Sequence, residues 1–528
     1  MPSKTTPTPA LYRRPSQCQA AADAIPILVD DEYHVFHLST PPNTIRHPPR
    51  LRSSWSRLRS SDLVNWQRDE IDALLPGKTR DSSDPDGAWT GSAIIGLDGN
   101  MHIFYTGYNL LQGGKQVILH ARSNDRKGSR FTKSPSAISI SGDMSRFEDI
   151  DFRDAHVSWQ ESENRFWMLV ATRLREGPFW TRGCLALLTS PNLEAWTIEP
   201  EPLYAPNDMF CPECPEIFSL PNGKWYLVYS RFHAPNAGTV YRIADSPRGP
   251  FKTPHLSSGG RFDARRWYAA KSCPKAADPN TRIYFGWVAD KLDGQWSWGG
   301  DMGVPREITA DESGHLIVRP CSEFLNATFS PRCEISLPST LAIKSVGQTK
   351  IEFFSAFGEI PEEYHFEFNI ISHDAASFGL LFRTTGNMDG HRLSFMPSTP
   401  DLFELVLARY PAPLDDFWAD QYNMHLPREV DGPEIARHLL NIRDSILVTV
   451  SNDVLEIFIG GKSISHRLSP ITRESQIQTI SGIDGCGREG GNGSLQNDKL
   501  WKDAQPLGVF VEDGYLELAN MCLRSRTS

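Results

Sequence analysis

The segment Tyr33-His-Val-Phe-His37 decides the fold, because four later segments repeat its pattern. Each is a short run of aromatic and aliphatic residues after a polar or turn-forming stretch, which is typical of a β-strand. The other four are Met101–Tyr105, Phe166–Val170, Trp225–Tyr229 and Ile283–Trp287. From Tyr33 onward, the first residues lie 68, 65, 59 and 58 positions apart. A spacing this regular indicates an internal structural repeat.

A second sequence element follows the first in the same order. Ser61-Asp-Leu-Val-Asn-Trp66 lies 28 residues after the start of the first strand segment, and Ser190-Pro-Asn-Leu-Glu-Ala-Trp196 lies 24 after the third. Weaker versions are Ser123–Asp125 and Ser246–Phe251. Five repeats, each with several short strands, together predict a five-bladed β-propeller. A β-sandwich with accidental similarity is the alternative, but the shared order of both elements favours the propeller.

The chain is therefore expected to be all-β, with two domains. Residues 1–19 have no apolar core of a signal peptide and predict a loose N-terminal arm. Residues 20–320 predict the propeller, and 321–338 read as a connector. Residues 339–528 alternate as strands do and predict an antiparallel β-sandwich, with a flexible Gly- and Asn-rich insertion at 481–506.

Composition excludes several classes of partner. Lys plus Arg number 54 against 64 Asp plus Glu, and this net charge of −10 argues against nucleic acid and anionic membranes. The sequence contains no apolar run of about 18 residues, the length that a helix needs to span a bilayer. Nine scattered cysteines favour reduced thiols and a cytoplasmic location. No nucleotide-binding motif occurs, and Cys211-Pro-Glu-Cys214 lacks a second ligand pair, so neither a cofactor nor a metal is expected.

Three carboxylates lie just upstream of the repeats, where the innermost strand of each blade should lie. Asp23, Asp154 and Glu213 precede their repeat segments by 10, 12 and 12 residues. The same place in the other two repeats holds Trp89-Thr-Gly-Ser92 and Tyr268-Ala-Ala-Lys271. Because innermost strands line the channel of a propeller, the three carboxylates should converge there.

Converging carboxylates suit the hydrolysis of a glycosidic bond. One carboxyl protonates the leaving oxygen, and another attacks the sugar or activates water. Crowding separates their pKa values, so that one serves as acid and another as base. Structural alternatives remain for each: an Asx-turn at Asp23, a local ion pair of Arg153 with Asp154, and Glu216 as a competitor of Glu213.

The chain resembles glycoside hydrolase family 32, the invertase, inulinase and levanase family. The resemblance rests on the order and spacing of several motifs across most of residues 20–320. These are Trp55 with Ser60–Trp66, Trp89–Ser92, Phe104–Gly107, Phe152–Asp154, Glu213–Phe218, Trp267–Ala270, Trp298–Gly300 and Pro305–Glu307.

The resemblance implies a retaining β-fructofuranosidase-like enzyme that acts on a carbohydrate. It makes Asp23 the nucleophile, Glu213 the acid/base and Asp154 the transition-state stabiliser, with Arg153 beside it. The substrate-binding residues that it implies are Trp55, Trp89, Ser92, Arg153, Asp263, Tyr268 and Trp298.

Two departures from the family keep other readings open. Ala21–Pro26 replaces the motif Trp-Met-Asn-Asp-Pro-Asn-Gly, and Ala155 replaces the proline of Arg-Asp-Pro. The form Asp-x-x-Pro at Asp23 also resembles family 43, which acts on arabinosides and xylosides with inversion of configuration. A propeller recruited to sugar binding or to another small-molecule reaction is the non-hydrolytic alternative. The separation of the two carboxyls would decide the stereochemistry, at about 5–5.5 Å for retention and 6.5–9.5 Å for inversion.

Overall fold

The computed structural model describes residues 12–44, 52–232, 237–256, 258–276, 278–292, 295–410, 434–469 and 504–527. The chain forms two compact units, both built from β-strands. The first runs to Phe262 and continues from Arg266 to Phe324, and the second contains Asp263–Arg265 and the chain from Leu325 onward. Among the described residues, no helix combines the length and the apolar character needed to cross a membrane.

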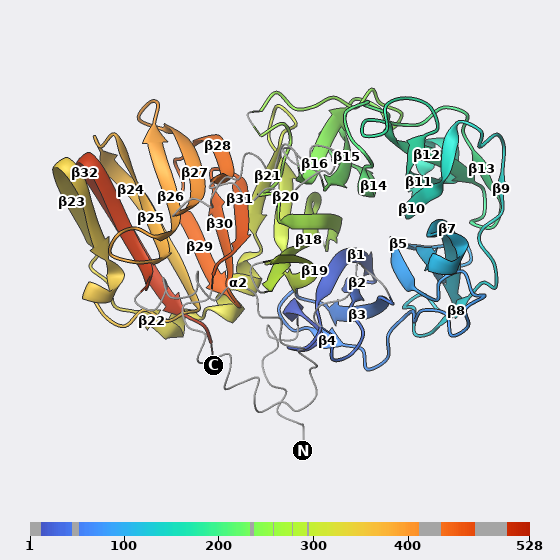
Figure 1. The fold of residues 1–528 in the computed structure, drawn as a ribbon, viewed down its shortest axis with the longest axis horizontal. Helices are drawn as coiled ribbons and strands as arrows, with labels where there is room; N and C mark the ends of the chain where they lie inside the picture. The colour runs from blue at the N-terminus through green and yellow to red at the C-terminus, as the bar shows by residue number, and fades with distance from the viewer. Residues whose placement is uncertain are drawn as a thin grey trace, which may run out of the picture. The chain divides into compact units, whose positions relative to one another are not determined.

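All five predicted repeat segments lie in the second strand of their group. These strands are β2 (Glu32–Ser39), β6 (Met101–Asn109), β11 (Arg165–Leu174), β15 (Trp225–Arg231) and β18 (Asp278–Leu292). Each pairs antiparallel with the strand before it. Those preceding strands are β1 (Ala21–Val29), β5 (Gly87–Ile95), β10 (Phe147–Gln160), β14 (Glu213–Ser219) and β17 (Trp267–Lys275). Figure 1 shows the groups following one another around the first unit, as in a β-propeller.

The outer strands complete these groups. They are β3 (Ser54–Ser60), β4 (Gln67–Arg68), β7 (Lys115–Ser123), β8 (Phe131–Lys133), β9 (Ile140–Ser141), β12 (Gly183–Ser190), β13 (Trp196–Ile198), β16 (Gly238–Ala244), β19 (Gln295–Met302), β20 (Arg306–Ala310) and β21 (Leu316–Pro320). Backbone pairing of Ala21 in β1 with Gly300 in β19 joins the first and last groups into one sheet. Within the described ranges the first unit therefore has four sheets, and the count of five blades stays a prediction.

The second repeat element forms the same turn in two different groups. The buried indole of Trp66 donates to the carbonyl of Leu63 at 2.9 Å, and that of Trp196 donates to Leu193 at 3.2 Å. Both leucines have positive φ, at 62° and 69°. The sequence similarity therefore reflects a shared turn before β4 and β13.

The described part of the N-terminal arm is anchored firmly, although the sequence predicts a loose segment. Tyr12 is fully buried, and its ring lies 5.1 Å from the rings of both Trp66 and Phe324. The guanidinium of Arg14 pairs with Asp290 and Asp301, on β18 and β19. Those two carboxylates raise the pKa of Arg14 above its usual value. Sequence reading missed these ion pairs because Asp290 and Asp301 lie 276 and 287 positions from Arg14.

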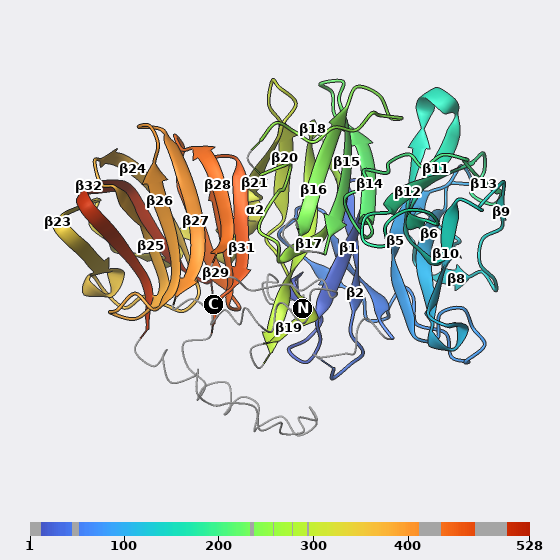
Figure 2. The ribbon, with the colours of Figure 1, turned by 45° about the horizontal axis from the view of Figure 1, so that its top comes forward.

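The second unit is the predicted β-sandwich. Its strands are β22 (Glu334–Ile335), β23 (Thr340–Phe353), β24 (Tyr364–His373), β25 (Ser377–Thr384), β26 (Gly390–Pro397), β27 (Leu402–Tyr410), β28 (Glu434–Asn441), β29 (Ile446–Ser451), β30 (Val454–Ile459), β31 (Lys462–Arg467) and β32 (Gln505–Ser525). Figure 2 shows β26 and β27 side by side in this unit. Phe366, Leu380 and Val509 lie in its apolar core.

The long strand β32 joins both layers of the sandwich. Its first part pairs with β25, and its second part pairs with β24. The strand changes partner at Asp513 and Gly514, whose φ values are 45° and 140°. Strands commonly switch sheets at such bends. The predicted strands 508–511 and 514–518 are thus two parts of one strand.

Two other sequence expectations fall on the connecting segments. The connector predicted at 321–338 contains helix α2 (Ser322–Thr328), a 3-10 turn (Pro331–Cys333) and β22. Elements this short have too few residues for a periodic pattern, so the sequence concealed them. The insertion predicted at 481–506 lies outside the described residues up to position 503.

Candidate active site

Every innermost strand of the first unit has a β-bulge at the same place. The pairing register skips between Ala22 and Ala24, Trp89 and Gly91, Arg153 and His156, Glu213 and Glu216, and Tyr268 and Lys271. Four of the residues that open a bulge have positive φ: Asp23, Asp154, Cys214 and Ala269. Bulges bend a strand and redirect its side chains, and they are common beside active sites.

The bulges also correct the alignment of the three carboxylates. Asp23 and Asp154 occupy the bulge position itself, whereas Glu213 lies one residue earlier. Cys214 holds the bulge position in β14. Counting back from each repeat segment could not reveal this offset, because bulges change the register by one residue.

Asp23 is buried and held by two donors from different strands. Its Oδ2 accepts from the hydroxyl of Thr90 at 2.5 Å, and its Oδ1 accepts from the indole of Trp287 at 2.9 Å. These bonds fix the orientation of the carboxylate. Each oxygen has further lone pairs, so the group can still act on a substrate.

Asp154 lies in a fully enclosed position on β10. Its backbone N–H donates to the hydroxyl of Thr106 at 2.9 Å, and its Oδ2 accepts from the N–H of Cys214 at 2.9 Å. Arg153 Nε lies 3.9 Å from the same oxygen. Burial raises the pKa of Asp154, and the charge of Arg153 offsets part of that rise.

Glu213 accepts hydrogen bonds from side chains on two other strands, β10 and β17. Its Oε1 accepts from Arg153 Nη2 at 3.0 Å, and its Oε2 accepts from the hydroxyl of Tyr268 at 2.5 Å. Only 3% of Glu213 is exposed. Arg153 therefore touches both Asp154 and Glu213, and it offsets negative charge that would otherwise destabilise the buried site.

The environment of Cys214 shows that the three carboxylates converge. Burial raises the pKa of this thiol well above its usual value, and Asp154, Asp23 and Glu213 all raise it further. The protonated Sγ lies 3.7 Å from Asp154 Oδ2. All three carboxylates thus act electrostatically on one buried thiol.

Glu216, the competitor of Glu213, has a different set of contacts. Its carboxylate accepts from the Ser272 backbone N–H at 3.1 Å, from the Ser272 hydroxyl at 2.8 Å and from Arg282 Nη2 at 3.1 Å. It is 1% exposed. These bonds tie β14 to β17 and β18, which indicates a structural role.

Several predicted aromatic residues lie around the carboxylates. Trp89 stacks on Tyr108 with ring centroids 4.1 Å apart. Trp287 lies between Tyr268 and Trp298, at 5.9 and 6.2 Å. Tyr268 and Trp298 are partly exposed, so their rings are available to a ligand.

Trp55 and Ser92, which the sequence predicts as sugar contacts, both have partners within the protein. Trp55 is fully buried and donates its indole N–H to the Trp89 carbonyl at 3.0 Å, so it positions Trp89 from the core. The Ser92 hydroxyl accepts from the backbone N–H of Val157 at 2.8 Å and joins neighbouring blades.

Asp263 also differs from its predicted role. It belongs to the second unit, where its Oδ2 accepts from the hydroxyls of Ser463 at 2.6 Å and Ser465 at 3.0 Å. The partners lie about 200 positions further along the chain, beyond the reach of motif reading. Since these bonds occupy the carboxylate, Asp263 is left out of the proposed site.

Trp287 and Thr90 are the residues that sequence reasoning missed as partners of Asp23. Trp287 ends the fifth repeat segment, and Thr90 lies in the motif Trp89-Thr-Gly-Ser92. The signal was available in the alignment of the repeats, because Thr90 holds the bulge position that Asp23 holds in β1.

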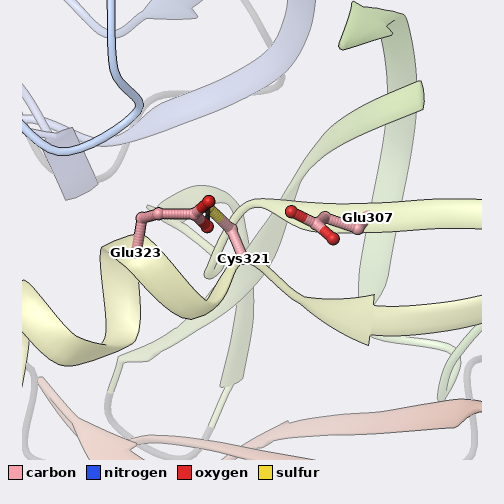
Figure 3. A group of neighbouring side chains, drawn as sticks. All are labelled: Glu307, Cys321 and Glu323. Carbon is pink, nitrogen blue, oxygen red and sulfur yellow. Dashed lines mark hydrogen bonds between the residues drawn. The ribbon is translucent and has the colours of Figure 1, made fainter. Parts of the chain in front are cut away.

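One group of potential metal ligands occurs among the described residues. Figure 3 shows Glu307, Cys321 and Glu323, whose ligand atoms lie within 4.8 Å of one another. The Lys275 ammonium lies 2.5 Å from Glu307 and 3.9 Å from Glu323. Burial raises the pKa of Cys321 to about 12, which disfavours the thiolate that a metal needs. The group is thus an ion pair around a lysine.

The eight cysteines within the described ranges are all free. Cys211 and Cys214, the C-x-x-C pair, are both buried, and burial raises the pKa of each thiol well above its usual value. These neutral thiols pack into β14 and the segment before it.

A family model decides between the families that the sequence left open. The model of the glycosyl hydrolases family 32 N-terminal domain matches residues 24–320, which is more than half of the chain. The chain belongs to glycoside hydrolase family 32. The match begins one residue after Asp23, so the case for Asp23 rests on its bulge and its contacts rather than on the match.

Two curated relatives that the chain resembles are plant proteins. An insoluble isoenzyme of β-fructofuranosidase from Arabidopsis thaliana is 25% identical over 323 residues, covering 56% of this chain and 53% of the relative. A fructan 6-exohydrolase from Beta vulgaris is 25% identical over 320 residues, covering 56% and 51%. The chain thus spans about half the length of the curated relatives that it matches.

Solved structures of family 32 enzymes share the fold over nearly the whole chain. The exo-inulinase of Aspergillus awamori superposes with a TM-score of 0.68 and 17% identity, covering 99% of both chains. Fructan 1-exohydrolase IIa of Cichorium intybus gives 0.64 and 15%, covering 98% of this chain and 97% of its own. This likeness establishes the propeller and the sandwich as the fold.

Proposed function

We propose that this chain is a retaining β-fructofuranosidase-like glycoside hydrolase. The observation that carries the proposal is the ring of contacts around the three carboxylates. Thr90 and Trp287 hold Asp23, Tyr268 and Arg153 hold Glu213, and Cys214 holds Asp154. A nucleophile, an acid/base and a third carboxylate are the groups that glycoside hydrolysis of this kind needs.

In the first step, Glu213 gives its proton to the glycosidic oxygen while an Asp23 oxygen attacks the anomeric carbon. The bond from that carbon to the leaving oxygen breaks, and an alcohol departs. The fructosyl group is then an ester of Asp23. Asp154 stabilises the positive charge that develops on the ring between these two bonds.

In the second step, Glu213 takes a proton from water, and the water oxygen attacks the same carbon. The ester bond breaks and Asp23 leaves as a carboxylate, which restores the starting state. Two inversions give overall retention. Both steps use only side chains and water.

The hydrogen-bond donors on Asp23 support its assignment as the nucleophile. Thr90 and Trp287 stabilise the ionised form of Asp23, which a nucleophile needs. Tyr268 orients Glu213 with a bond of 2.5 Å. The partly exposed rings of Tyr268 and Trp298 offer stacking surfaces for a sugar.

The names of the relatives support the substrate class. They include β-fructofuranosidases and fructan exohydrolases, so we propose a carbohydrate with a terminal β-fructosyl unit as the substrate. We further propose residues 20–320 as the catalytic part and 339–528 as a supporting sandwich. A cytoplasmic location stays a prediction. The free thiols favour it, whereas the name of one relative, a cell wall isozyme, does not support it.

A substrate panel tests the proposal. The wild type, Asp23→Ala and Glu213→Gln are assayed on natural and aryl fructosides, arabinosides and xylosides. We expect the wild type to cleave fructosides and both variants to lose that activity. Activity on arabinosides or xylosides alone would favour the inverting alternative, and activity on none of them would favour a non-hydrolytic propeller. Fructoside cleavage that survives both substitutions would overturn the assignment.

A further inference from the structure

An aromatic surface lies next to the site in the loop between β11 and β12. Phe179 and Trp180 are 50% and 41% exposed, which is high for large rings. Their ring centroids lie 4.9 Å apart, and each lies 5.4 Å from that of Phe210. We call Phe179, Trp180 and Phe210 the aromatic ledge.

A buried arginine holds the ledge rigidly. The guanidinium carbon of Arg173 lies 4.2 Å from the Phe179 ring and 4.0 Å from the Phe210 ring. Its Nη2 also donates to the Phe179 carbonyl at 2.9 Å, and the residue is 3% exposed. Cation–π contacts of this kind are worth more when desolvated. Arg173 therefore holds Phe179 and Phe210, and the Trp180 ring packs against both of them.

A chain of ion pairs connects the ledge to Glu213. Arg173 Nη1 lies 3.2 Å from Asp151 Oδ2, and Asp151 Oδ1 lies 2.7 Å from Arg153 Nη1. Arg153 Nη2 in turn lies 3.0 Å from Glu213 Oε1. Arg173, Asp151 and Arg153 thus link the ledge to Glu213, the proposed acid/base.

The strand register places the ledge at the same edge of the blades as the carboxylates. Leu174, the last residue of β11 before the loop, pairs with Phe147, the first residue of β10. Phe210 precedes Glu213 by three residues. The ledge therefore borders the site between the third and fourth repeats.

We propose that the aromatic ledge binds the leaving-group part of an oligosaccharide substrate. This inference rests on the proposed function, because Glu213 protonates the leaving oxygen and so marks the side on which the leaving group lies. Three ion-pair contacts separate Glu213 from the rings, so the ledge holds a sugar beyond the one directly bonded to the fructosyl unit.

The size of the ledge favours a sugar over a protein partner. A specific protein interface buries about 800 Å² on each partner, far more than two exposed rings offer. A sugar ring presents one apolar C–H face of about the area of an aromatic ring, and aromatic faces supply such contacts at low cost in side-chain entropy.

Chain-length dependence tests the ledge. Trp180→Ala and Phe179→Ala should raise KM for a fructosyl tetrasaccharide about tenfold, the size of one aromatic contact. KM for sucrose should change less than about twofold, because a disaccharide ends before the ledge. Trp180→Phe keeps a ring and should restore much of the binding of the tetrasaccharide. Leu97→Ala removes a side chain that is 70% exposed on the turn between β5 and β6, and it serves as the matched control.

Calorimetric binding to Glu213→Gln separates this proposal from the proposed function. Glu213→Gln should bind the tetrasaccharide about tenfold more tightly than Glu213→Gln with Trp180→Ala. If the wild type cleaves no glycoside and this difference is still found, the proposed function fails, and the ledge is a sugar-binding surface without a leaving-group role. Equal losses for sucrose and tetrasaccharide, or no loss for either, would overturn the ledge whatever the wild type cleaves.

Discussion

Two glutamates on one strand show how the same residue type takes on different work. Glu213 opens β14 at the bulge, and Glu216 follows three residues later where pairing with β15 has resumed. Both are almost completely buried. Glu213 has Arg153 and the Tyr268 hydroxyl as partners, whereas Glu216 is bound by Ser272 and Arg282.

The difference lies in what each set of contacts leaves free. The bonds of Glu216 join three strands of two repeats, so its carboxylate stabilises the fold. Glu213 lies at the bulged end of the strand beside Arg153, which also approaches Asp154, and this is where we propose that a ligand binds. Burial alone therefore does not identify a catalytic carboxylate; its neighbours do.

The largest expected effect comes from exchanging each glutamate for glutamine. Glu213→Gln should lower kcat/KM on a natural fructoside about 10²–10⁴-fold, because the leaving oxygen loses its proton donor. Glu216→Gln should reduce the free energy of unfolding by about 1–3 kcal/mol, with activity per folded molecule retained. Steady-state assays and thermal unfolding measure both. The comparison breaks if Glu216→Gln loses activity while it remains folded.

Asp154→Asn should trade stability against activity. Burial raises the pKa of Asp154, so the folded state binds its proton more tightly than the unfolded state. Stability from this group is then lost as pH rises from the unfolded pKa through the folded one. The asparagine cannot ionise, so the variant should have a higher Tm than the wild type at neutral pH. Well below about pH 3.9, the usual pKa of aspartate, the two proteins should have similar Tm values.

The same Asp154→Asn variant should lose about 10²–10³-fold in kcat, since it removes a charge that stabilises the transition state. Thermal unfolding at the two pH values and a kinetic assay check both parts. A lower Tm at neutral pH would show that Arg153 outweighs burial at this carboxylate.

The smallest expected effect concerns the hydroxyls that hold the two glutamates. Tyr268→Phe removes a hydrogen bond to a charged group, worth about 1.5–3 kcal/mol, so kcat/KM should fall roughly 10–100-fold and the pH profile should shift. Ser272→Ala removes the corresponding donor to Glu216 and should lower Tm without shifting that profile. A shifted pH profile in Ser272→Ala would mean that Glu216 takes part in the reaction.

Much of the fold was predictable from the sequence because the repeats carry it. The five repeat segments, the turn at Trp66 and Trp196, and the strands of the sandwich follow from local patterns of aromatic, apolar and turn residues. The sequence also predicts that Asp23, Asp154 and Glu213 converge, since equivalent strands of a propeller face one channel.

What the sequence concealed depends on contacts between distant positions. The bulges shift Glu213 against Asp23 by one residue, and Trp287 reaches Asp23 across 264 positions. Asp263 bonds to Ser463 across 200 positions. Such pairs leave no local pattern, so motif matching placed Asp263 in the pocket and overlooked Trp287.

The central claim is a covalent fructosyl ester on Asp23 with Glu213 as the acid/base, and intact-protein mass spectrometry tests it most directly. An aryl β-fructoside with a good leaving group needs no acid, so Glu213→Gln should form the ester and release it slowly. The account predicts a gain of one fructosyl unit in mass, carried by the peptide that contains Asp23 and absent from the double variant with Asp23→Ala. Release of the aryl alcohol without any adduct, or an adduct on another residue, would contradict the account.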